Sequence, residues 1–123
     1  MSNHATDNKN LGNRGEEIAK SYLITNGYSF VTKNYRAGRR EIDLIFYQKN
    51  KLIFIEVKTR VKTKDSLLEN SLSVRQTKNL KKAIVEYCLE KSVSLDKVRL
   101  DLVNILIDEK EHCAQLKHYK DIL

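Results

Sequence analysis

The stretch EIDLIFYQKNKLIFIEVKTR, residues 41–60, decides the fold, because both of its halves alternate between apolar and polar side chains as paired β-strands do. We expect strands over residues 40–47 and 52–61. A tight turn centred on Lys49 and Asn50 joins them; this dipeptide is a weak hairpin signal, but the two alternating runs support it.

The register of this hairpin brings acidic residues together. Antiparallel partners across the turn have residue numbers that sum to 99, so Asp43 is predicted to lie opposite Glu56. Glu41 then lies opposite Lys58. Strict alternation places Asp43, Glu56 and Lys58 on one face of the hairpin. The other face would carry the apolar residues Ile42, Leu44, Phe46, Ile53, Ile55 and Val57.

The opposed acids Asp43 and Glu56 need a physical reason. Like charges directly opposite one another, with Cβ atoms about 5 Å apart, are destabilising. At an effective dielectric constant near 20 their repulsion is about 3 kcal/mol. A divalent cation would remove that cost, since Mg²⁺ is commonly held by one or two carboxylates. Such an ion polarises a phosphoryl oxygen and lowers the pKa of a bound water.

Lys58 has two possible roles beside this pair. On the same face as Glu56, it could orient the attacking water or offset negative charge that develops in the reaction. Alternatively, Lys58 simply neutralises Glu41 and Glu56 in a cross-strand ion-pair network.

A fourth carboxylate lies on a helix predicted over residues 13–25. Its apolar stripe leaves Glu16 at the edge that can reach the sheet, whereas Glu17 faces solvent. Gly15 costs about 1 kcal/mol of helix propensity, which suggests a close backbone approach at this turn. A local role is the alternative: Asn13 as N-cap with Glu16 three residues later makes a capping box.

The remaining elements complete an α/β domain. We expect a strand over 28–36, a loop over 62–72, a helix over 74–91 and strands over 98–107 and 113–119. Ser73 and Gln76 fit a capping box at the start of the 74–91 helix. The order αβββαββ predicts a mixed central sheet flanked by helices. Residues 1–12 are expected to be a flexible leader, and residues 13–123 a single domain.

Composition favours a polyanionic partner. The formal net charge is +7, and the spans 31–40, 58–64 and 75–82 carry 12 of the 23 basic residues without any acid. Solvated surface lysines are the alternative. No apolar run approaches the roughly 18 residues of a membrane span, and two cysteines without ligand spacing favour a cytoplasmic protein.

Three segments carry a resemblance to a known family. GNRGEEIAKSYLITNGY, NYRAGRREIDLI and LIFIEVKTR resemble the opening blocks of the YraN-type family of small bacterial proteins. That family is similar to Holliday-junction resolvases and to the wider PD-(D/E)xK nuclease superfamily. The resemblance implies a restriction-endonuclease-like core.

The resemblance also assigns roles to residues. Asp43 takes the place of the superfamily's Asp, Glu56 and Lys58 form its ExK, and Glu16 stands where resolvase-like members carry a helix carboxylate. Asp43 and Glu56, assisted by Glu16, would hold Mg²⁺ or Mn²⁺, and Lys58 would position water. Two positions depart from the pattern: Ile42 replaces a proline, and Gln76 stands where related sequences often have a lysine.

The resulting expectation is a metal-dependent nuclease that acts on nucleic acid, with branched or structured DNA favoured over RNA and a homodimer as the candidate assembly. Glu41 and Gln76 are expected to support the site at its margin. Predicted phosphate contacts are Arg36, Arg39, Arg40, Arg60, Lys62, Lys64, Arg75 and Lys78. The alternatives are a nucleic-acid-binding module that keeps the fold without catalysis, and a protein-interaction domain. Asp101 is expected to form a cross-strand pair or to support the metal ligands from outside, instead of binding the metal itself. His118 is expected to be a packing or surface residue.

Overall fold

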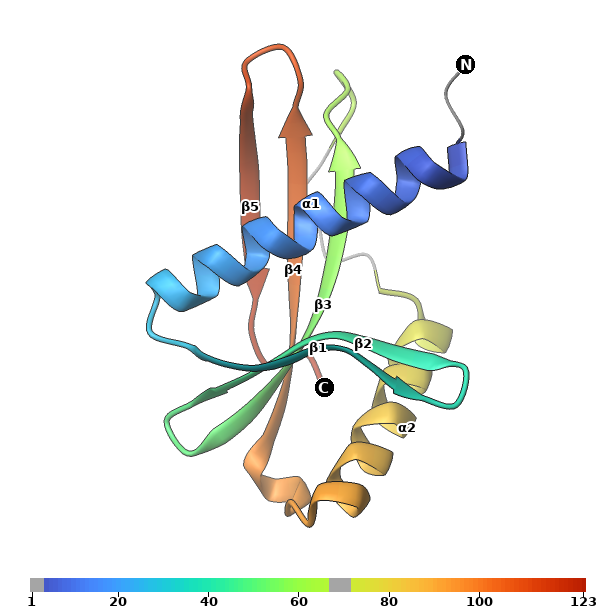
Figure 1. Cartoon of the computed structure of the whole chain (residues 1–123), viewed down its shortest axis with the longest axis vertical. Helices are drawn as coiled ribbons and strands as arrows, with labels where there is room; N and C mark the ends of the chain where they lie inside the picture. The colour runs from blue at the N-terminus through green and yellow to red at the C-terminus, as the bar shows by residue number, and fades with distance from the viewer. Residues whose placement is uncertain (1–3, 67–71) are drawn as a thin grey trace.

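The computed structural model describes the backbone of residues 4–66 and 72–123, with side chains from residue 9 onward. Its elements in chain order are α1 (His4–Thr25), β1 (Ser29–Ala37), β2 (Arg40–Gln48), β3 (Lys51–Val61), α2 (Val74–Lys91), the short 3₁₀ helix η1 (Leu95–Lys97), β4 (Val98–Asp108) and β5 (Cys113–Tyr119) (Figure 1). The predicted loop 62–72 is free of helix and strand where it is described, and its residues 67–71 lie outside the described part.

One mixed sheet organises the molecule. Its strands lie in the order β1-β2-β3-β4-β5, and only β3 and β4 run parallel to each other. The connection between those parallel strands passes through α2, as a parallel pair requires a crossover. The predicted α/β architecture is confirmed and is consistent with a restriction-endonuclease-like core.

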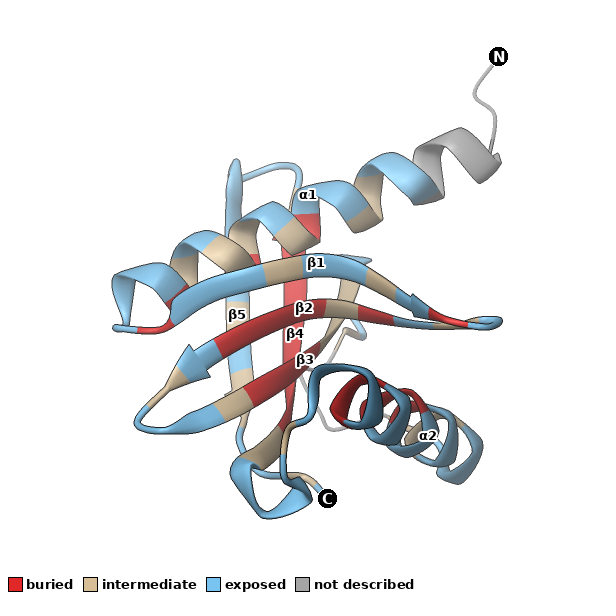
Figure 2. Cartoon of the chain, turned by 60° about the horizontal axis from the view of Figure 1, so that its bottom comes forward, coloured by how far each residue is buried: buried red, intermediate tan, exposed pale blue. Residues whose placement is uncertain are grey.

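The two helices cover opposite faces of the sheet, and each builds its own core. Ala19 and Leu23 of α1 pack in one cluster, whose sheet residues are Leu44, Phe46, Ile53, Ile55, Val103, Ile105 and Ile107. Leu80, Ala83 and Ile84 of α2 pack in the other, whose sheet residues are Ala37, Ile42, Ile45, Phe54 and Leu100. Figure 2 shows the buried residues gathered on the middle strands and on the side of α2 that faces them.

The β2–β3 hairpin has the predicted register. Its pairs run from Leu44 opposite Ile55 to Gln48 opposite Lys51, and each pair of residue numbers sums to 99. Both turn residues adopt left-handed backbone angles, with φ of 49° at Lys49 and 65° at Asn50. Two positive φ values suit a two-residue turn whose twist matches the strands.

The predicted start of the first helix is wrong. α1 begins at His4, so residues 4–12, expected to be a flexible leader, are helical, and Asn13 is an interior residue instead of an N-cap. Leu11 gives this extension a contact, since it packs partly against the α1-side core. A polar segment in which Leu11 is the one large apolar residue has no helical period that the sequence would reveal.

Within the described residues, no helix is long and apolar enough to cross a membrane.

Candidate active site

Strands β2 and β3 separate at the point where Asp43 and Glu56 lie. The pairing of β2 with β3 ends at Leu44 and Ile55. One residue further, the carboxylate of Asp43 accepts a hydrogen bond of 2.8 Å from the backbone N–H of Val57. A side chain thus replaces the ladder there, and it holds Asp43 against β3.

Strict alternation fails on β2 at Asp43. Leu44 packs in the α1-side core, but Ile42 packs in the α2-side core, so the prediction that they share a face is wrong. The cause lies on both strands. Lys33 of β1 pairs with Leu44, and Tyr35 pairs with Ile42, so Asn34 lies beside Asp43. The φ of Asn34 is 52°, a left-handed value that reverses the alternation of β1, and Tyr35 therefore faces α2.

Alternation holds on β3, which fixes where Glu56 and Lys58 point. Ile55 and Val57 pack against the α1-side core, so Glu56 and Lys58 lie on the face that α2 covers. Asp43, held in the plane of the sheet by Val57, lies between the two faces.

Asp43 and Glu56 converge, and we call them the carboxylate pair. Burial raises the pKa of Glu56 most, and a hydrogen bond with Asp43 and the negative charge of Asp43 raise it further. The ammonium of Lys58 opposes this shift in pKa. In the metal-free protein the environment of Glu56 therefore favours its protonated form over a second charge beside Asp43.

Glu16 approaches the pair from α1. Burial raises its pKa to about 7, and the negative charges of Asp43 and Glu41 add to that effect, while Lys33 opposes it. The negative charge of Asp43 therefore raises the pKa of both Glu16 and Glu56.

Gly15 determines how closely Glu16 can approach. A Cβ atom built on Gly15 would overlap the side chain of Thr59 on β3, whereas one on Gly12 would meet nothing. The predicted close backbone approach is confirmed. Because Gly15 rests on β3, the neighbouring Glu16 is held against the sheet, close enough for the charge of Asp43 to act on it.

The donor set suits a divalent cation without forming a complete cage. Carboxylate oxygens are the ligands that Mg²⁺ and Mn²⁺ take, so the chemistry of the carboxylate pair fits such an ion. Among the residues described, no group of three or more His, Cys, Asp or Glu side chains is arranged to hold a metal. Glu16 as a third ligand stays a prediction.

A cavity of about 220 Å³ opens beside Glu56 on the α2 side. Its lining residues are Arg39, Arg40, Glu41, Glu56, Gln76, Asn79 and Leu80. The predicted margin residues Glu41 and Gln76 are thus brought to the site. The capping role of Gln76 is also confirmed, since its side chain accepts from the Ser73 N–H at 2.9 Å and Ser73 Oγ accepts from the Gln76 N–H at 3.1 Å. Asn79 was missed, although it follows Gln76 by three residues on one helix face.

The predicted phosphate contacts fall into separate places. Arg39 and Arg40 line the cavity beside Glu56, although Arg40 also pairs with Glu86 at 3.8 Å. Arg36 pairs with Glu41 at 3.9 Å. Arg75 and Lys78 are exposed in the first turns of α2, and Arg60 is exposed near the end of β3.

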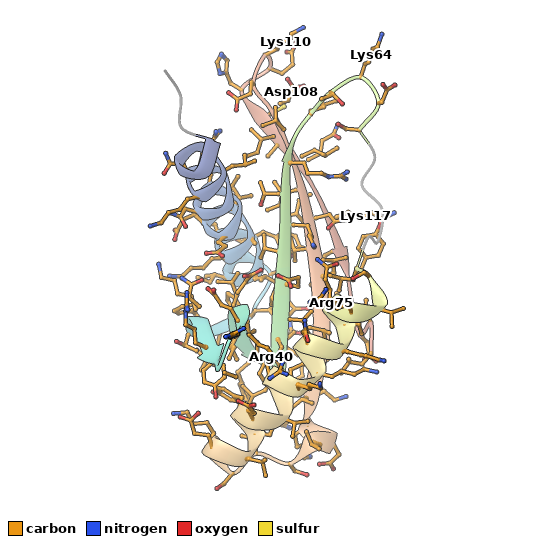
Figure 3. All side chains as sticks on the ribbon, turned by 90° about the vertical axis from the view of Figure 1, so that its right-hand side faces the viewer. Arg40, Lys64, Arg75, Asp108, Lys110 and Lys117 are labelled. Atoms are coloured by element: carbon orange, nitrogen blue, oxygen red, sulfur yellow. The ribbon has the colours of Figure 1, made fainter. Side chains whose placement is uncertain are left out.

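Lys62 and Lys64 lie at the far tip of the molecule. They line a different cavity together with Asp108, Glu109 and Lys110, and Lys62 pairs with Asp108 at 3.8 Å. Figure 3 shows Lys64, Asp108 and Lys110 together at this end, well away from Arg40 and Arg75. The three basic spans therefore do not merge into one cluster around the carboxylate pair.

A second buried acid, Asp101, is fully partnered. Arg99 donates two hydrogen bonds to its carboxylate, at 2.9 and 2.8 Å, and the ring of His118 lies 2.7 Å away. The backbone N–H of Asp121 donates a fourth, at 2.9 Å. The expected cross-strand pair of Asp101 is confirmed, because its partner His118 lies on the neighbouring strand β5. His118 is a packing residue, since its side chain is almost fully buried.

Comparison with known proteins gives a consistent set of relatives. A family model described as "Uncharacterised protein family UPF0102" matches residues 15–105, a range that holds Glu16, the carboxylate pair and Lys58. A UPF0102 protein of Caldicellulosiruptor bescii is 35% identical over 115 residues, which cover 92% of this chain and 96% of that relative. One of Chlorobium phaeobacteroides is 31% identical over 121 residues, 95% of either chain.

Proposed function

This chain belongs to the uncharacterised protein family UPF0102, and the names of its relatives state no activity. From the residues of the chain itself we propose that the protein hydrolyses phosphodiester bonds in branched or otherwise structured DNA, with the help of a divalent metal ion. The expected YraN-type family is this one. The observation that carries the proposal is the convergence of Asp43 and Glu56 at the point where β2 leaves β3.

The carboxylate pair is the proposed holder of Mg²⁺ or Mn²⁺, with Glu16 assisting directly or through water. A bound divalent ion supplies Lewis acidity toward a phosphoryl oxygen and lowers the pKa of a water ligand. Folding gains nothing from two acids in contact, because the negative charge of Asp43 raises the pKa of Glu56. A binding role explains why the sequence places them there.

Lys58 is the proposed positioning group for water. It lies on the same face as Glu56, two residues along β3, and close enough for its charge to lower the pKa of Glu56. From this place its ammonium can donate a hydrogen bond to the attacking water or to a phosphate oxygen that gains negative charge. The water oxygen attacks phosphorus, the bond to the leaving strand's oxygen breaks, and the proton released by water passes to a nearby carboxylate or to solvent.

Arg39 and Arg40 are the proposed contacts to phosphates that flank the cleaved bond. They line the cavity that Glu56 also lines, and their guanidinium groups can donate hydrogen bonds to phosphate oxygens there. Binding through phosphate contacts weakens steeply with salt.

A nucleic-acid-binding module without catalysis is the second candidate. The observation that favours it is the lack of a three-ligand metal set among the described residues. In that case the carboxylate pair would remain as an inherited feature of the fold, and the basic residues alone would serve binding.

A cleavage assay separates the two. Purified protein is incubated with a four-way junction, a single strand and a duplex, in Mg²⁺ or Mn²⁺, and the strands are resolved on a denaturing gel. The nuclease proposal predicts metal-dependent cuts that Asp43→Ala or Lys58→Ala reduces by about 100-fold or more. The matched control Glu17→Ala, on the exposed side of α1, should cut normally. Binding without any cut in either metal would support the binding module, and cuts that persist in Asp43→Ala would overturn the nuclease proposal.

A further inference from the structure

We propose that β5 carries a binding subsite for an unpaired nucleic-acid strand, formed by Lys117 and Tyr119, which extends the carboxylate site across the sheet. The proposal rests on the proposed function, because it concerns the same face and the same class of substrate. Neither residue belongs to the basic spans that the sequence singled out.

The register of three strands places these residues beside the site. Glu56 pairs with Leu102 of β4, which pairs with Tyr119 of β5. The next row on the same face runs from Lys58 through Asn104 to Lys117, and the one after that from Arg60 through Leu106 to Gln115. Paired residues in a sheet point to the same face, so Tyr119 and Lys117 share the face of Glu56 and Lys58.

The residues between these rows confirm the assignment of faces. Val57 pairs with Val103, which pairs with His118, and the side chain of His118 lies 3.2 Å from the Tyr22 hydroxyl of α1. Val103 belongs to the α1-side core. The intervening rows therefore face α1, and the rows of Tyr119 and Lys117 face the opposite side. Figure 3 shows Lys117 and Arg75 on the side of β3 away from α1.

The chemistry of the three rows suits a polyanion. Beyond Glu56 they contain no acid, whereas they carry the three cations Lys58, Arg60 and Lys117. Lys117 and Arg60 are exposed, whereas Leu102 and Leu106 on the intervening strand β4 are buried. A surface that carries these cations attracts phosphates.

Tyr119 makes the subsite suited to an unpaired strand. Its ring is half-buried, and the Lys117 ammonium lies 5.1 Å from the ring centroid. An aromatic ring beside a cation is the arrangement that single-strand binders use, because each unpaired base offers a face for stacking. In a duplex those faces are already stacked. Adjacent strands lie about 4.8 Å apart, so the backbone at Tyr119 is about 10 Å from that at Glu56, within reach of neighbouring nucleotides.

Fluorescence anisotropy with a labelled oligothymidylate tests the subsite, in EDTA so that no cleavage occurs. We expect Lys117→Glu and Tyr119→Leu each to weaken single-strand binding by about 5-fold or more. Tyr119→Phe should keep the affinity because it keeps the ring. Lys49→Glu, an equal charge change at the exposed β2–β3 turn, should alter it less than 2-fold. For a blunt duplex, Tyr119→Leu should have little effect. Circular dichroism checks that each variant is folded.

The outcomes distinguish the subsite from the nuclease. If folded Lys117→Glu and Tyr119→Leu bind the oligothymidylate as tightly as the parent, or if the parent does not bind it at low salt, the subsite is overturned. Metal-dependent cleavage that still requires Asp43 would leave the nuclease proposal standing in either case. Conversely, loss of binding in the two variants, with no cleavage by the parent, would support the subsite and overturn only the nuclease.

Discussion

At the scale of single residues, burial and charge compete at the carboxylate pair. Asp43 is fixed by the Val57 N–H, and Glu56 lies against it in a half-buried position. The negative charge of Asp43 and the burial of Glu56 raise the pKa of Glu56, and Lys58 opposes only part of that shift. The pair therefore destabilises the metal-free protein, and the proposed cation would relieve that cost.

The pH dependence of stability should reveal this competition. The folded-state pKa of Glu56 is raised above its ordinary value of 4.5, so its contribution to stability is complete below pH 4.5 and is lost as pH rises toward the folded-state pKa. Glu56→Gln should therefore gain stability over the parent as pH increases, by about 1–3 kcal/mol between pH 5 and pH 9. Urea unfolding in EDTA measures it. A constant difference between the two proteins across this range would contradict the account, and Glu17→Gln serves as the exposed control.

The closeness of Asp43 and Glu56 could be predicted from the sequence, but the direction in which Asp43 points could not. The alternating hairpin and the sum of 99 were sufficient to bring Asp43 and Glu56 together. The reversal at Asp43 depends on the left-handed Asn34 of another strand, and no local pattern announces it. The place of the proposed subsite residues Tyr119 and Lys117 was not predicted for a similar reason, since their rows depend on the parallel register of β3 with β4.

At the scale of elements, the contact of α1 with β3 determines where Glu16 lies. The helix can approach β3 closely because Gly15 has no side chain, and Thr59 fills the space instead.

The two helices also show which helix bounds a sequence can predict. The bounds of α2 were found because Ser73 and Gln76 mark its start, whereas α1 extends nine residues before the predicted 13 without a comparable signal.

Two glycine substitutions on one helix test the contact. Gly15→Ala should destabilise the protein by about 1–3 kcal/mol, because the new methyl group overlaps Thr59 and must push α1 outward. Gly12→Ala should stabilise it by up to about 1 kcal/mol, since it gains helix propensity in open space. Thermal unfolding compares both variants with the parent. Equal effects at the two positions would show that α1 does not press on β3 at Gly15.

At the scale of the whole molecule, Asp101 joins segments that are distant in sequence. Its carboxylate binds Arg99 of β4, His118 of β5 and the backbone of Asp121 near the C-terminus. Arg99 continues the network to the Tyr28 hydroxyl at 2.9 Å. Burial alone would raise the pKa of Asp101, but the hydrogen bonds from His118, Arg99 and Asp121 hold it below the ordinary value.

Removing that charge should loosen the whole fold. Asp101→Asn leaves Arg99 without its buried counter-ion, and we expect a loss of about 3 kcal/mol at neutral pH. Because the folded-state pKa is lowered, the stabilisation is present above the ordinary pKa of 3.8 and disappears as pH falls below it. The two proteins should therefore converge in stability in acid. Urea unfolding at pH 7 and in acid measures this, with Asp65→Asn as an exposed control; a loss that persists undiminished in acid would contradict the account.

Binding of Mn²⁺ is the most direct test of the central claim that Asp43 and Glu56 together hold a divalent ion. In the metal-free, ¹⁵N-labelled protein, a Mn²⁺ titration should broaden the amide signals around residues 43 and 56–58 first, by paramagnetic relaxation. Signals of the distant β2–β3 turn at Lys49 should stay sharp. Asp43→Asn should abolish the selective broadening at equal Mn²⁺. Broadening that begins elsewhere, or that survives unchanged in folded Asp43→Asn, would contradict the claim.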